Sequence, residues 1–228
     1  MNALVERIRT KGYWDVAIHP DPFRSDLVPY DELDAILNQA VVRLRGWPVP
    51  FIDYRQAFVH HQDWIGQDID ARDVSHEEAW RFFTSGQFTQ LRVISADRRV
   101  GAEATPVPVG AASVIEIWEI LFYLTEIVEL AARLALSHAG GDRMTIDIHL
   151  HGLENRLLVS GTPERMLERD YRTSAPSIWE KRTLQRDHLV AEPRQVAVDM
   201  SREMFLRFGF KASEQVLTDY QKELTDGR

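Results

Sequence analysis

Residues 145–151 alternate strictly between polar and apolar side chains. A period of two predicts a strand with one buried and one exposed face. The apolar side consists of Ile146, Ile148 and Leu150. The other side gathers Thr145, Asp147, His149 and His151. This is the one place where spacing alone puts several residues suited to metal binding or proton transfer on a single face.

Two hairpins are predicted around turn-forming residues. Gly152-Leu-Glu-Asn155 would turn strand 145–151 into residues 156–160, so that Leu150 pairs with Leu157 and His151 lies beside Arg156. Ser85-Gly86 would join residues 78–84 to residues 87–95 in a tight turn. The second hairpin is then expected to pair Trp80 with Leu91, Phe82 with Thr89, Phe83 with Phe88, and Arg81 with Gln90.

A long helix is predicted over residues 111–138, closed by Gly140 and Gly141, because glycine accepts the left-handed conformation that ends helices. Its polar residues recur every three to four positions and form one stripe, while everything else is apolar. The pattern predicts a central helix, packed over most of its circumference, with a solvated stripe. The stripe consists of Glu116, Glu119, Tyr123, Glu126, Glu129 and Arg133.

The remaining pattern completes an α+β fold. Helices are expected over residues 2–10 and 30–40, and strands over 13–19, 41–45 and 178–189, with a loop over 161–178. Pro193 and Ser213 start a C-terminal helix pair, 193–208 and 213–224. We therefore predict a mostly antiparallel sheet built from hairpins, one long buried helix and this helix pair. The expected division is a core domain, 1–190, with the helical pair 191–228 packed on it. Residues 97–110 read as a connection.

Composition narrows the functional classes. The 228-residue chain is 44% hydrophobic, contains no cysteine and has a formal net charge of −8. The absence of cysteine excludes disulfides, thiolate nucleophiles and cysteine-held metal clusters, and it fits a cytoplasmic protein. An acidic chain disfavours nucleic-acid binding, because phosphate contacts need basic residues. Four glutamates inside the most apolar region argue against a membrane span.

The first candidate site is the polar face of strand 145–151. Two imidazoles in a His-x-His pair can ligate one metal ion, and Asp147 can be a third ligand or can orient a histidine. His60, His61 or Asp63 could complete the site from another strand. An ordinary exposed sheet face is the alternative, and Arg156 beside His151 favours it. No cofactor is expected beyond a possible divalent metal.

The second candidate is a face of the other hairpin. Aromatic and cationic side chains on one exposed face can stack nucleobases or anchor a protein partner. The alternative is that another layer buries the aromatic rings while the arginines reach solvent. This predicted face consists of Arg81, Phe83, Phe88 and Arg92. No phosphate-binding loop, dinucleotide fingerprint, nucleophile elbow or zinc-protease helix occurs in the chain.

Three segments resemble uncharacterised bacterial proteins of similar design. These are YWDVAIHP at Tyr13–Pro20, LRGWPVP at Leu44–Pro50 and the WRFFTSGQF hairpin that starts at Trp80. The resemblance covers about the first hundred residues. It implies a bacterial cytoplasmic protein and carries over no activity or catalytic residue.

We expect a non-catalytic protein-interaction or sensor subunit, because six tryptophans accompany no assembled catalytic motif. Its partner would be another protein or a second copy of itself. The alternative is a metal-dependent hydrolase or nuclease that uses Asp147, His149 and His151. The third reading is a module that binds single-stranded nucleic acid.

Overall fold

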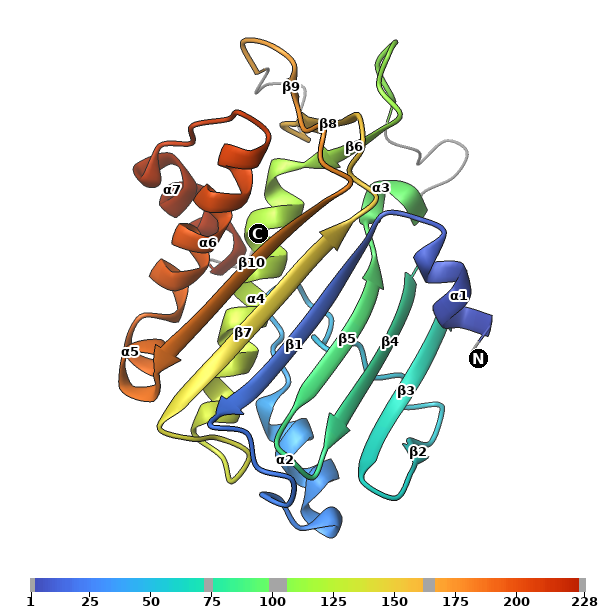
Figure 1. The fold of residues 1–228 in the computed structure, drawn as a ribbon, viewed down its shortest axis with the longest axis vertical. Coiled ribbons are helices and arrows are strands. Elements are labelled where there is room, and N and C mark those ends of the chain that lie inside the picture. Colours follow the sequence, from blue (N-terminus) through green and yellow to red (C-terminus); the bar gives the residue numbers. More distant parts are fainter. Residues whose placement is uncertain (1–2, 72–75, 99–105, 162–166, 226–228) are drawn as a thin grey trace.

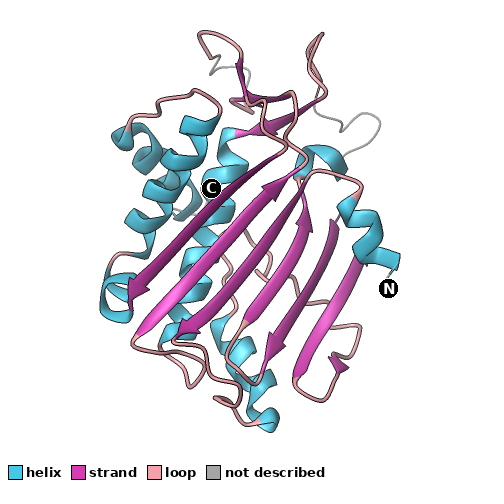
Figure 2. Ribbon diagram, in the orientation of Figure 1, coloured by secondary structure: helices cyan, strands magenta, loops and turns pink. Residues whose placement is uncertain are grey.

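The computed structural model describes residues 3–71, 76–98, 106–161 and 167–225. Seven strands form one antiparallel sheet in the order β10-β7-β1-β5-β4-β3-β2 (Figures 1 and 2). Their bounds are β1 Tyr13–Asp21, β2 Val59–His60, β3 Trp64–Ala71, β4 His76–Phe83, β5 Phe88–Val93, β7 Arg143–His151 and β10 Ser177–Gln185. A second, three-stranded sheet contains β6 Ser113–Glu116, β8 Arg156–Val159 and β9 Tyr171–Arg172.

Helices cover one face of the large sheet (Figure 1). The central one is α4, Ile117–Ala135, in which 15 of 19 residues are buried, as expected for a helix packed nearly all round. The C-terminal pair, α6 Pro193–Arg207 and α7 Glu214–Thr225, packs against α4. The remaining helices are α1 Ala3–Arg9, η1 Tyr30–Glu32, α2 Leu33–Ala40, α3 Ser95–Arg98 and α5 Arg186–Ala191. The predicted α+β class, buried helix and C-terminal pair are confirmed.

The predicted hairpin between β7 and residues 156–160 is wrong. β7 lies between β1 and β10, whereas β8 pairs in parallel with β6 and antiparallel with β9. The apolar side of β7 meets Trp14, Val16 and Ile18 of β1. This match is as apolar as the expected one with Leu157 and Val159, so hydrophobic pattern alone could not choose the partner.

The hairpin of β4 and β5 exists, but its register is shifted by one residue. Phe82 pairs with Phe88 and Arg81 with Thr89, because the loop spans residues 84–86 instead of two residues. The Phe83 amide donates to the Gln87 carbonyl at 2.9 Å, and Gly86 takes a φ of +77°. A three-residue loop with glycine in the left-handed region is a common hairpin closure. Since side chains alternate, the shift changes which residues share a face.

Other predicted elements also differ from the structure in their bounds or type. The predicted strand 41–45 is an isolated bridge between Val42 and Val49. The first residues of the expected helix 111–138 form β6 instead. Parts of the predicted connection 97–110 and of the loop 161–178 lie outside the described residues. In the described part of the chain, no helix is both long and apolar enough to cross a bilayer.

Candidate functional site

The second face of the large sheet is open over most of its area. α1 covers one corner, where Leu4 and Ile8 pack on Ala79 and Val93 (Figure 1). None of the other described helices covers this face (Figure 1). The strands β10, β7 and β1 therefore present one row of side chains to solvent on this face. That open face contains the predicted residues Asp147, His149 and His151.

Four aromatic rings stand in one row across these strands. Tyr13 stacks on His151 with ring centroids 4.5 Å apart and an interplanar angle of 14°. His151 lies against His149 at 5.8 Å and 10°, and His149 against Trp179 at 5.4 Å and 19°. The strand register explains the row, because Tyr13 pairs with His151 and Trp179 with His149. We call these four residues the ring row.

Asp147 contacts the two rings of the row that lie nearest the sheet edge, Trp179 and His149. The Trp179 indole N–H donates to its Oδ1 at 2.6 Å, and His149 Nε2 lies 3.4 Å from the same oxygen. Lys181 Nζ lies 3.4 Å from Oδ2. The contacts with Asp147 restrict the rotamers of Trp179 and His149, whose rings are nearly parallel. Trp179 is nevertheless 59% exposed at the edge of the sheet.

The other two rings of the row, His151 and Tyr13, are less exposed to water than Trp179. Asp15 pairs with His149 across β1 and β7. Burial raises the pKa of the Asp15 carboxyl, while the imidazoles of His151 and His149 oppose that shift. Burial also lowers the pKa of His151. Tyr13 and His151 then line one side of an open cleft of about 760 Å³, whose other walls include Lys11, Asp97 and Arg156.

Arg156 is not the surface neighbour of His151 that the sequence predicted. Its side chain is 2% exposed and forms a bidentate ion pair with Asp97, with both N···O distances below 3 Å. It also donates to the carbonyls of Val114 and Gly152. Because its charge is neutralised in the interior, Arg156 no longer argues against cation binding at the histidines.

The predicted face of Arg81, Phe83, Phe88 and Arg92 is split between the two sides of the sheet. Phe88 and Arg92 are 0% and 4% exposed and point toward the helix layer. Arg81 and Phe83 remain on the open side. The correction follows from the one-residue register shift of the hairpin. Arg81 instead lies 4.6 Å over the Trp64 ring and pairs with Asp68 at 2.8 Å.

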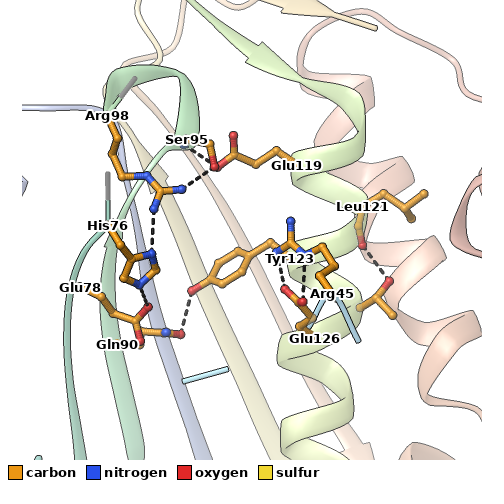
Figure 3. A network of polar contacts seen from close by, with 11 residues as sticks. Arg45, His76, Glu78, Gln90, Ser95, Arg98, Glu119, Leu121, Tyr123 and Glu126 are labelled. Carbon is orange, nitrogen blue, oxygen red and sulfur yellow. Dashed lines mark hydrogen bonds and ion pairs between the residues drawn. The ribbon is translucent and has the colours of Figure 1, made fainter. Parts of the chain in front are cut away.

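A buried polar network lies between the sheet and α4 (Figure 3). Glu78 accepts hydrogen bonds from the Phe51 amide at 2.9 Å and from His76 Nε2 at 2.8 Å. His76 Nδ1 lies 2.8 Å from Arg98 Nη1. Because a guanidinium can only donate, Nδ1 must accept, so His76 is neutral with its proton on Nε2. Burial lowers the pKa of His76, consistent with that state.

The expected solvated stripe of α4 is part of this network. Glu119 and Glu126 are 2% and 0% exposed. Glu119 accepts from the Ser95 amide at 2.7 Å, and Glu126 from Arg45 Nε at 2.9 Å (Figure 3). The expectation of solvent was wrong because these partners come from distant segments. Glutamates at helical spacing could not reveal them.

Some buried atoms of the network have no hydrogen-bond partner among the described residues. Among them are Gln90 Nε2, Arg92 Nε and Glu119 Oε2. The Tyr123 hydroxyl donates to Gln90 Oε1 at 2.8 Å, and the Arg92 guanidinium lies 4.7 Å over the Tyr123 ring. These contacts dock α4 on β5. Neither ring nitrogen of His76 is free to exchange a proton with a substrate.

The metal site predicted at Asp147, His149 and His151 has no complete set of ligands among the described residues. Within the described ranges, no group of three or more His, Cys, Asp or Glu residues could hold a metal ion. His60 lies on β2, and β1, β5, β4 and β3 separate that strand from β7. His60 and His61 therefore cannot complete a site at His149 and His151.

Sequence reasoning found two members of the ring row and missed Tyr13 and Trp179. Both lie on segments that were predicted as strands, and both fall on the same alternating side as the neighbouring polar residues. The missing information was the order of the strands. Comparison of the chain with models of protein families, with curated proteins and with solved structures found no match.

Proposed function

We propose that this chain is a non-catalytic interaction or sensor subunit of a bacterial cytoplasmic system, and that it binds another protein through the ring row. The observation that supports this proposal best is the stack of four nearly parallel rings on a sheet face of which α1 covers only one corner. Tryptophan and tyrosine are enriched where proteins bind one another, because they bury a large area at little entropic cost.

The orientation of the rings specifies the chemistry of the partner. Their faces are turned toward one another, so their edges point away from the sheet. Aromatic edges carry partial positive charge, and the imidazoles add N–H groups there. The proposed partner is therefore a protein segment that offers carbonyl or side-chain amide oxygens to these edges.

The same geometry disfavours the two other readings. Base stacking needs free ring faces, and in the ring row both faces of His149 and of His151 lie against neighbouring rings. Of the two phenylalanines on the face that was expected to stack bases, Phe88 is 0% exposed. For the metal-dependent hydrolase, no group of three or more His, Cys, Asp or Glu residues in the described ranges is arranged so that it could hold a metal ion.

Co-purification with the products of neighbouring genes tests the proposal. His149→Ala and Trp179→Ala should each weaken a complex at least tenfold, because both remove area at the centre or rim of the ring row. Trp47→Ala is the matched control, since Trp47 is 48% exposed outside the sheet. A complex that the ring-row variants leave intact, or that Trp47→Ala weakens equally, would overturn the proposal, as would the absence of any complex.

A further inference from the structure

The two edges of the large sheet differ. β2 is a stub of two residues, whereas β10 is a regular strand of nine residues without proline or glycine. Among the described residues, β10 pairs with β7 alone, and no other backbone hydrogen bond reaches it. A long regular edge offers unpaired N–H and C=O groups to another strand. In Figure 1, α6 and α7 stand behind the sheet and reach past β10 on its outer side.

The sequence of β10 is complementary to itself when read in the antiparallel direction. A two-fold axis through Lys181, perpendicular to the sheet, pairs the residues on either side of Lys181 with chemically suitable ones in a second copy. The facing pairs are Ile178 with Leu184, Trp179 with Thr183, and Glu180 with Arg182. Antiparallel partners must share a face, and this register meets that condition because each pair differs by an even number of positions.

The central pair is the one like-charged contact in this register. Two Lys181 side chains would face each other at the axis. Each Lys181 Nζ already lies 3.4 Å from Asp147 Oδ2 of its own chain. That carboxylate offsets the repulsion. Glu180 and Arg182, 2.7 Å apart within one strand, could exchange partners between copies without losing their ion pairs.

We propose that a second copy of this chain adds to β10, in the register centred on Lys181, and extends the sheet across a two-fold axis. The two open faces then lie on the same side, and the two ring rows form one continuous surface. On the other side, α6 and α7 of the two copies, which reach past β10 (Figure 1), would meet, so the proposed dimer requires these helices to pack against each other. The inference goes beyond the proposed function. It concerns the sheet edge, and it can fail while the ring row still binds a partner.

Cysteine cross-linking tests the register, because the natural chain has no cysteine. In a Lys181→Cys variant the two new side chains would face each other, with Cβ atoms about 5 Å apart. Mild oxidation should then convert most of the protein to a covalent dimer. Thr183→Cys is the control, since its two copies would lie about 14 Å apart, four strand rises. Equal cross-linking of the two variants, or none at Lys181→Cys, would overturn the register.

Charge exchange tests the interface without oxidation. The unmodified chain should sediment at twice its monomer mass at 100 µM. Glu180→Arg and Arg182→Glu should each be monomeric, because like charges would then face each other. An equimolar mixture of the two folded variants should form heterodimers, since each substitution then faces its opposite charge. Lys222→Glu, on α7, should leave the mass unchanged. A monomeric unmodified chain, or a mixture that stays monomeric, would overturn the proposal.

Discussion

Arg156→Ala should be among the most destabilising single substitutions in this protein. The guanidinium makes four hydrogen bonds of 2.7–2.9 Å: two to Asp97 and one each to the carbonyls of Val114 and Gly152. Asp97 also accepts the Gly12 amide at 2.7 Å. These contacts join the small sheet to the start of β1 and to α3. Removing the cation therefore loosens the junction of both sheets.

The expected cost follows from burial. Removing one partner of a buried ion pair costs about 3–5 kcal/mol, because the remaining charge stays desolvated and unpaired. The Asp97 side chain is 16% exposed, so water relieves part of this penalty. We therefore expect about 3 kcal/mol for Arg156→Ala. The double variant Arg156→Ala/Asp97→Ala should cost less than the sum of the single variants, because it leaves no unpaired charge.

Urea denaturation at pH 7 measures this loss as a shift of the midpoint at constant slope. Lys222→Ala provides the comparison, since Lys222 and Asp219 form an exposed pair on α7 with side chains 60% and 56% exposed. Such pairs contribute about 0–1 kcal/mol. If Arg156→Ala costs no more than Lys222→Ala, or if the double variant is strictly additive, the reasoning about the buried pair is refuted.

Three further outcomes are expected. Burial lowers the pKa of His76 below its ordinary 6.5, so the unfolded chain binds a proton first as pH falls. Stability should therefore be fully present above pH 6.5 and decline below it, by at most about 1.4 kcal/mol per pH unit. Urea midpoints between pH 7 and 5 should show this slope reduced in His76→Gln and kept in His61→Gln. Gly86→Ala should cost more in thermal unfolding than Gly46→Ala. Both glycines have positive φ, but only at Gly86 would the new Cβ meet a carbonyl, Ala139 O, at 2.5 Å. Zinc or manganese should leave the melting temperature unchanged, whereas a rise abolished by His149→Ala would restore the metal reading.

Local pattern was sufficient for some elements and not for others. The alternation in residues 145–151 and the helical spacing after residue 117 each follow from one segment, and both elements are present. Partner choice does not follow from one segment, because the apolar side of β7 suits β1 and β8 equally well. The buried state of Arg156 and Glu126 depends on Asp97 and Arg45, which lie far away in the chain. The complete ring row could not be predicted for the same reason, because its residues come from three strands whose order in the sheet was unknown.

The position of β1 also constrains how the chain can fold during synthesis. This strand begins at Tyr13 yet lies in the interior of the sheet, where Tyr13 pairs with both Val93 and His151. Contacts so distant in sequence are slow to form, because long loops must close first. Until residue 151 leaves the ribosome, one edge of β1 has no strand to pair with. Any nascent chain that stops before β7 therefore leaves one edge of β1 unpaired, although both edges of this strand are paired in the finished sheet.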